Sequence, residues 1–240
     1  MDTVMVEHLK SKPEVAAAAA EALANLVVGN RANQQLLGHA KIFRPLMDLL
    51  SNFDVNCQSN GACAIRCLCV QVPIAKIAVH AGVLPLLVQL LASFDSMVQW
   101  HAADALWNLA LADAHKRSII AAGGVQPLVV MLSSRDVRCQ SAAIGCLRSL
   151  STLTDGKAPV VRAGALPAVV ELLQHPDPRV QLNAVGLLTA LAHDVTHRQT
   201  LVSDAELGVL TAVTALMEHP DADDTLSHRA QALKHILSGV

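Results

Sequence analysis

The chain has 240 residues, of which 52% are hydrophobic, 16% charged and only 2% aromatic, and its formal net charge is −2. So large an apolar fraction must be buried, either in one large core or in a stack of repeats. A core of small and medium aliphatic residues suits closely stacked helices better than a sandwich or barrel. The near-neutral charge excludes an overall basic surface, so no nucleic-acid partner is expected.

Polar side chains interrupt every long hydrophobic run. Lys76, His80 and Gln89 divide the longest run, so no segment reaches the roughly 18 apolar residues of a membrane span. The first residues, MDTVMVEHLK, lack the charged-then-apolar layout of a signal peptide. We therefore expect a protein that is not inserted into a membrane and that is located in the cytoplasm or the nucleus.

Similar residues recur at one fixed interval along the chain. Asp54, Asp95, Asp136 and Asp177 are spaced 41 residues apart. The same spacing relates two further columns, Gln58, Gln99, Gln140 and Gln181, and Ile65, Leu106, Leu147 and Leu188. Three independent columns with one period indicate a repeat protein. We place the units of a single domain, 1–240, near residues 1–37 (incomplete, beginning inside a second helix), 38–78, 79–120, 121–161, 162–204 and 205–240.

The clearest unit reads VHAGVLPLLVQLLASFDSMVQWHAADALWNLALA over residues 79–112. In chain order, Gly82 predicts a sharp turn and Pro85 the first turn of a largely aliphatic helix. Asp95 then precedes a longer helix from about Val98 to Leu111, where its carboxylate can accept from unpaired backbone N–H groups. Gly124 with Pro127 and Gly164 with Pro167 repeat the turn. Short segments such as AHKRSIIA and GKAPVVRA add a further helix, which gives three helices per unit.

This pattern resembles the armadillo repeat, of the generic β-catenin-like type. The resemblance rests on AGVLPLLVQLL, FDSMVQ and ALWNLA and covers almost the whole chain. It implies an all-α fold, a right-handed α-solenoid of three-helix repeats, and a non-enzymatic scaffold for protein–protein interaction. The HEAT repeat is the alternative, but its units usually have two helices and lack the short first helix with its Ala-Gly turn.

In armadillo proteins the third helices line a concave groove in which extended peptides bind. An Asn on those helices often hydrogen-bonds the peptide backbone, and here Asn25 and Asn108 occupy that column. The Trp array with which importin-α binds basic side chains is absent, which argues against nuclear-signal transport. Its positions are filled by Glu21, Cys63, Asp104, Gly145, Gly186 and Gln231.

Both Trp residues, Trp100 and Trp107, lie on one predicted third helix. Packed helices lie about 8–10 Å apart, so Arg66 and Arg148 are expected to flank Trp107 from adjacent layers. Trp and Arg are enriched in interface hot spots. We therefore predict a partner-binding groove, for an extended peptide or a helix, that contains Arg66, Trp100, His101, Asp104, Trp107, Asn108, Arg148 and Asn25. The alternative is that Trp107 is partly core and the Arg side chains are solvated.

No cluster of residues has the spacing of a catalytic or metal site. Cys57, Cys63, Cys67 and Cys69 lack the Cys-x2-Cys knuckle of zinc sites and are expected to be reduced thiols in hydrophobic positions. His193 and His197 form His-x3-His without the Glu of a zinc protease. We therefore expect no enzyme activity, no metal and no cofactor.

Three questions stay open at the level of sequence. The repeats could recruit substrates in a larger ubiquitin ligase, which would require a U-box outside this chain. They could also form a structural subunit of a cytoskeletal or axonemal assembly, with self-association through the incomplete first repeat. Finally, Gly145 and Gly186 lie inside third helices, where Gly costs about 1 kcal/mol relative to Ala. Either close packing or a smooth groove floor would explain them.

Overall fold

The computed structural model describes residues 2–218 and 224–239 and divides into two compact units, Met1–Pro127 and Leu128–Val240. All regular elements of the described residues are helices, so the predicted all-α class is confirmed. The prediction was a single domain over residues 1–240. In a helical repeat array each repeat contacts only its neighbours, so no common core has to join one end to the other.

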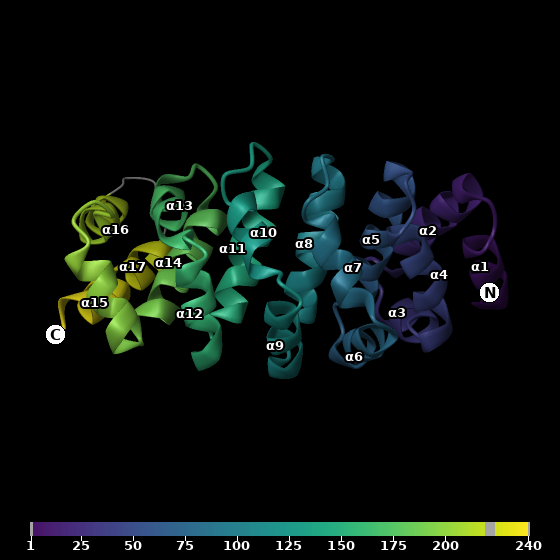
Figure 1. The fold of residues 1–240 in the computed structure, drawn as a ribbon, viewed down its shortest axis with the longest axis horizontal. Coiled ribbons are helices and arrows are strands. Elements are labelled where there is room, and N and C mark those ends of the chain that lie inside the picture. Colours follow the sequence, from purple (N-terminus) through teal and green to yellow (C-terminus); the bar gives the residue numbers. More distant parts are fainter. Residues whose placement is uncertain (1, 219–223, 240) are drawn as a thin grey trace. The chain divides into compact units, whose positions relative to one another are not determined.

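Helices follow one another closely in the first unit (Figure 1). They are α1 (Asp2–Leu9), α2 (Pro13–Val27), α3 (Arg31–Leu37), α4 (Ala40–Leu50), α5 (Val55–Leu68), α6 (Val72–Ala81), α7 (Val83–Leu90), α8 (Ser96–Leu109) and α9 (Asp113–Ala121). The boundary between the units falls within α10 (Val125–Met131).

The second unit continues the same pattern. Its helices are α11 (Val137–Leu150), α12 (Thr154–Arg162), α13 (Ala165–Glu171) with the 3-10 turn η1 (Leu172–Gln174), α14 (Pro178–Ala192), α15 (Val195–Ser203), α16 (Val209–Glu218) and α17 (Asp224–Ser238). Each triplet therefore consists of a short first helix, a second helix and a long third helix, as predicted. The predicted boundary at residues 78/79 lies inside α6, because the Gly82 turn separates the first helix from the second and not one repeat from the next.

The long third helices stack side by side within each unit. In the first unit α5 packs against both α2 and α8, and in the second α14 packs against both α11 and α17. The aliphatic column of the 41-residue period lies at the centre of these stacks. Its members are fully buried: Ile65, Leu106, Leu147 and Leu188.

The repeated Asp caps the N-terminus of four third helices, α5, α8, α11 and α14. Asp95 Oδ1 accepts from the backbone N–H groups of Met97 at 2.8 Å and Val98 at 3.0 Å. The same kind of cap is formed by Asp54, Asp136 and Asp177. Each cap satisfies backbone donors that the helix itself leaves unpaired, which explains the strict spacing of the column.

The repeated Gln holds the end of the second helix. Gln99 Nε2 donates to the Leu91 carbonyl oxygen at 3.2 Å. The equivalent bonds run from Gln140 to Leu132 and from Gln181 to Leu173, and Gln58 donates to the carbonyl oxygen of Asn52, two residues past the matching position. The Asp column thus caps the third helix, the Gln column joins it to the end of the second helix, and the aliphatic column fills the core.

The predicted turn glycine is correct in two repeats and displaced in a third. Gly82 and Gly164 adopt the left-handed conformation with φ of 97° and 77°. Between α9 and α10 the left-handed residue is Gly123, with φ of 80°, and not the predicted Gly124. Gly124 is required for a different reason, since a Cβ there would lie 2.9 Å from Ile119 Cγ2.

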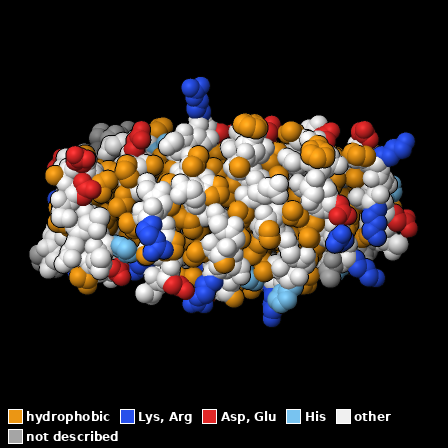
Figure 2. Space-filling model, in the orientation of Figure 1, with side chains coloured by type: hydrophobic (Ala, Val, Ile, Leu, Met, Phe, Trp, Pro, Cys, Tyr) orange, Lys and Arg blue, Asp and Glu red, His pale blue; other side chains and the backbone are white. Residues whose placement is uncertain are grey.

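Apolar side chains also reach the surface. On the face shown in Figure 2 they are interspersed with polar ones over both units. Phe53 and Phe94, which precede two of the capping Asp residues, are fully exposed. Among the described residues no single helix is long and apolar enough to cross a membrane, and α6 with α7 meets these criteria only as a pair bent by 88°.

Candidate functional site

Arg66 of α5 reaches across to α8 and is held there by two partners. Its Nη1 lies 3.2 Å from Asp104 Oδ2, and the two side chains are 21% and 22% exposed. Its Cζ lies 5.1 Å from the ring centroid of Trp100. Partial burial strengthens both the ion pair and the cation–π contact relative to a fully solvated pair. The guanidinium is therefore fixed in position at the junction of two third helices.

His101 lies beneath this contact. Its ring centroid is 4.3 Å from that of Trp100, with an angle of 32° between the planes. The side chain is only 5% exposed, and its Nδ1 has no hydrogen-bond partner. His101 was predicted as part of a binding surface, but its side chain is buried and its ring contacts that of Trp100. The reason is the turn of the helix, which points residue 101 toward α5 and leaves Trp100 half-buried.

Asn108 uses its side chain to join the two helices. Its Nδ2 donates to the backbone oxygen of Arg66 at 3.1 Å. The resemblance implied that this Asn would bind the backbone of a peptide. One of its two N–H groups is instead engaged by the neighbouring layer, so a peptide could bind only its remaining N–H and its Oδ1. Asn25 in the equivalent column of α2 is exposed.

The sequence predicted that Arg66 and Arg148 flank Trp107, but in the structure each of them contacts a different residue. The ring that Arg66 covers is that of Trp100. Trp107, two turns further along α8, is half-buried. Arg148 belongs to the second unit, where its Nη1 donates to Asn183 Oδ1 at 3.0 Å.

Arg148 also explains a glycine that the sequence left open. A Cβ on Gly186 would lie 2.5 Å from Arg148 Nε and 2.8 Å from its Cδ. The Arg side chain therefore lies flat against α14, and Gly186 makes room for it. Burial, together with the charge of Arg229, lowers the pKa of Arg148. Close packing, the first of the two predicted explanations, accounts for this glycine.

Sequence reasoning did not place the thiols Cys63 and Cys67 in this site. Arg66 Nη2 lies 3.7 Å from Cys63 Sγ. Cys67 follows one turn later on α5, and its carbonyl oxygen accepts from Gln34 Nε2 at 3.1 Å. The signals in the sequence were the i, i+4 spacing of the two thiols and their alignment with groove columns, Cys63 with Asp104 and Cys67 with Asn108. We use the name Arg66 cluster for Cys63, Arg66, Cys67, Trp100, His101 and Asp104.

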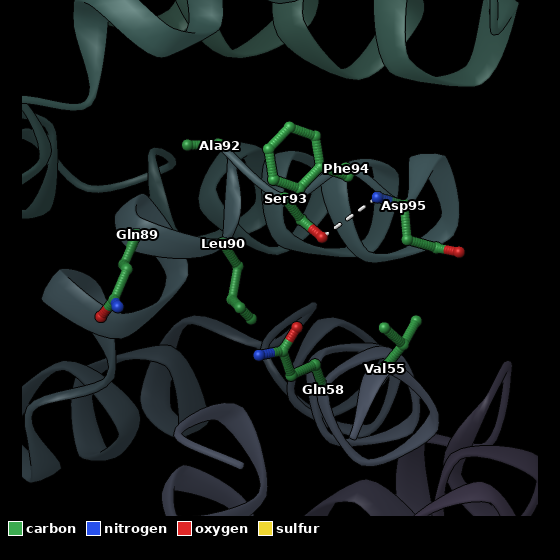
Figure 3. Close-up of a pocket in the computed structure, with 8 residues that line it drawn as sticks. All are labelled: Val55, Gln58, Gln89, Leu90, Ala92, Ser93, Phe94 and Asp95. Atoms are coloured by element: carbon green, nitrogen blue, oxygen red, sulfur yellow. Dashed lines mark hydrogen bonds between the residues drawn. The ribbon is translucent and has the colours of Figure 1, made fainter. Parts of the chain in front are cut away.

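Shallow hollows occur at the corners between repeats. One, of about 500 Å³, is shown in Figure 3, where Val55 and Gln58 face the end of α7 and the following corner; it is lined by Val55, Gln58, Gln89, Leu90, Ala92, Ser93, Phe94 and Asp95. A hollow of about 390 Å³ has equivalent lining residues 82 positions later, among them Gln140, Glu171 and His175. Because it recurs with the repeat, we attribute it to the repeat geometry. In the parts of the chain that the structure describes, no three His, Cys, Asp or Glu side chains come together as a metal site.

Stacked three-helix repeats that expose side chains from a ladder of third helices define a helical repeat protein. Residues 72–111, 113–152 and 154–193 match the family model described as Armadillo/beta-catenin-like repeat. The chain therefore belongs to the armadillo repeat family, as the sequence predicted. The matched segments coincide with the triplets from α6 to α14, which confirms the armadillo-type solenoid.

Solved structures of designed armadillo proteins are similar to this chain. "Designed armadillo repeat protein YIII(Dq)4CqI" has 25% identity and a TM-score of 0.90, over 99% of this chain and 100% of that one. "Computationally designed armadillo repeat proteins for modular peptide recognition" has 25% identity and a TM-score of 0.90, over 98% and 99%. "Designed armadillo repeat protein YIII(Dq.V1)4CPAF in complex with peptide (KR)4" has 24% identity and a TM-score of 0.88, over 98% and 99%. A search of curated proteins found no match.

Proposed function

We propose that this chain is a non-enzymatic scaffold that binds an extended peptide or a helix of a partner protein on the third-helix ladder of its first unit. The observation that carries the proposal is the Arg66 cluster, in which a half-buried Arg and Trp are fixed between α5 and α8. A related designed armadillo protein, described as made for modular peptide recognition, supports the same use of the fold.

The chemistry of this surface favours a partner with apolar or aromatic anchors. Trp100 and Trp107 offer two large rings on one helix, both half-buried. Arg66 is already paired with Asp104, so the surface has little unbalanced charge. Rings held in place by neighbouring side chains lose little conformational entropy when a partner docks, and buried Trp residues often dominate the energy of an interface.

A displayed library of random peptides, selected for binding to the intact chain, tests this proposal. We expect the selected peptides to lose at least roughly 30-fold in affinity toward Trp100→Ala or Trp107→Ala, the effect of removing a hot-spot residue worth about 2 kcal/mol. Phe94→Ala is the matched control, because it removes a fully exposed aromatic residue from a corner outside the ladder.

The outcome of the control decides between two surfaces. Peptides whose affinity is unchanged by both Trp substitutions, or is lost in Phe94→Ala instead, would contradict binding on the ladder. Circular dichroism of each variant distinguishes a lost contact from a lost fold. Isothermal titration calorimetry with one selected peptide then gives the affinities.

A further inference from the structure

The Arg66 cluster contains one thiol that differs from all the others. The six cysteines lie within the described part of the chain, and all are reduced. Five of them are at most 4% exposed: Cys57, Cys67, Cys69, Cys139 and Cys146. Cys63 alone is partly accessible to solvent. A small reagent that approaches the third-helix ladder therefore meets Cys63 first.

The surroundings of Cys63 favour its ionised form. Arg66 Nη2 lies 3.7 Å from Cys63 Sγ, and a guanidinium at this distance stabilises a thiolate. A hydrogen bond with Cys67 is the largest cause that lowers the pKa of Cys63, followed by a hydrogen bond and charge from His101 and the hydrogen bond from Arg66. The pKa of Cys67 is raised by the same bond and by burial, so only one thiol of the pair ionises.

His101 provides a second, independent feature of the site. It is 5% exposed, and its Nδ1 has no partner in the described structure. Leaving a buried ring nitrogen unsatisfied costs free energy. Polar atoms that a modification adds to Cys63 would lie next to this imidazole and to the Arg66 guanidinium.

We propose that Cys63 is a modification site, a nucleophilic thiol that hydrogen peroxide oxidises to a sulfenic acid and that soft electrophiles alkylate. This inference goes beyond peptide binding and does not depend on it. The thiolate sulfur attacks one oxygen of the peroxide, an S–O bond forms as the O–O bond breaks, and hydroxide leaves and takes a proton from solvent. Sulfur loses two electrons, and the peroxide is reduced to water.

The neighbouring thiol does not resolve this product easily. Residues four apart on a helix have Cβ atoms about 5–6 Å apart, whereas a disulfide requires about 3.5–4.5 Å. Cys63 and Cys67 both lie within the regular helix α5. The sulfenic acid is therefore expected to persist until an external thiol or a trapping reagent reacts with it.

Alkylation of the intact chain by iodoacetamide between pH 6 and pH 8 tests the nucleophilicity. Peptide mapping by mass spectrometry gives the rate at each thiol. We expect Cys63 to react first and its rate to change by less than about threefold over this range. An ordinary thiol with a pKa of about 8.5 would change by roughly 75-fold. Such an ordinary profile at Cys63, or faster labelling of any other cysteine, would overturn the proposal.

Two substitutions separate the role of Arg66 from general effects. Arg66→Gln is expected to shift the midpoint of the Cys63 alkylation profile to higher pH, since the lost cation no longer stabilises the thiolate. Arg138→Gln is the matched control, because Arg138 adjoins the buried Cys139, and it should leave the Cys63 rate unchanged. Equal rates in the wild type and Arg66→Gln would contradict the assigned geometry.

The oxidation is tested separately with hydrogen peroxide and a 1,3-diketone that traps sulfenic acids. The expected result is one trapped adduct on the wild-type chain, located at Cys63 and absent from Cys63→Ser. Trapping at another cysteine, or none at Cys63 in a chain that iodoacetamide labels there, would overturn the oxidation step.

Discussion

Two arginines in the same column of the repeat show how the next layer determines the role of a side chain. Arg66 and Arg148 are 82 residues apart and both reach toward the following third helix. Arg66 meets Asp104 and stacks on Trp100, whereas Arg148 meets Gly186 and donates to Asn183. Arg66 is held by an ion pair and an aromatic ring, whereas Arg148 lies in the space that Gly186 leaves on the surface of α14.

The packing of Arg148 against Gly186 can be tested by substitution. Gly186→Ala gains about 1 kcal/mol of helix propensity, but the new Cβ displaces the Arg148 side chain and its bond to Asn183. We expect the substitution to be close to neutral in the wild type and to stabilise the Arg148→Ala variant by about 1 kcal/mol. Urea unfolding of the four proteins of this double-mutant cycle measures the coupling. The same effect of Gly186→Ala in both backgrounds would contradict the proposed packing.

At the scale of the helix, the capping Asp couples stability to pH. In α14 the side-chain hydrogen bond from Arg179, and then its backbone N–H, hold the pKa of Asp177 below its ordinary value. A carboxylate with a lowered pKa in the folded state stabilises the fold above its unfolded pKa of about 3.9. That stabilisation is lost as the pH falls through the lower, folded value.

Asp177→Ala is therefore expected to lower the free energy of unfolding by about 1 kcal/mol at pH 7, the usual effect of removing an N-cap. The difference from the wild type should shrink as the pH falls below the unfolded pKa of about 3.9 and then through the lower, folded value, where the wild-type carboxylate is itself protonated. Urea unfolding at pH 7 and pH 2.5 measures both values. Glu21→Ala, an exposed position inside α2, serves as the control. A loss of equal size at both pH values would show that the Asp177 charge is not involved.

At the scale of the whole molecule, a repeat array should respond locally to damage in its core. Leu106 is fully buried in α8, and Leu106→Ala should cost about 2–5 kcal/mol. Because stability in such arrays comes from each repeat and its nearest neighbours, we expect faster amide hydrogen exchange mainly in α5, α7 and α8. Mass spectrometry of exchanged peptides locates the change.

Leu188→Ala provides the matched comparison in the second unit. It removes the same atoms from the same column of α14, where Leu188 is also fully buried. Hydrogen exchange should increase in α14 and in α11 and α17, which both pack against it. Uniform acceleration over both units from either substitution would indicate a single cooperative core and would contradict the local response.

The sequence predicted most of what depends on periodicity. Its three columns correspond to a helix cap, an inter-helix bond and a buried aliphatic position, because each is defined by the repeat itself. It did not predict which side chains pair across layers. Arg66 covers Trp100 and not Trp107, and His101 is buried, because these contacts depend on the rotation of each helix about its own axis. Gln34, whose Nε2 bonds both Val27 and Cys67, belongs to no periodic column and gave no signal.

The concentration of both Trp residues on α8 has a consequence for how a partner could be aligned. A surface built from equal steps offers an extended chain several nearly equivalent placements, each shifted by one step. Such degeneracy would let a ligand slide and would blur recognition. α8 carries two Trp side chains that α2 and α5 lack. Only one placement brings an anchor residue of the ligand to these rings, so the equivalent placements are no longer equal. The two Trp residues of α8 would thus fix the register in which the partner's sequence binds.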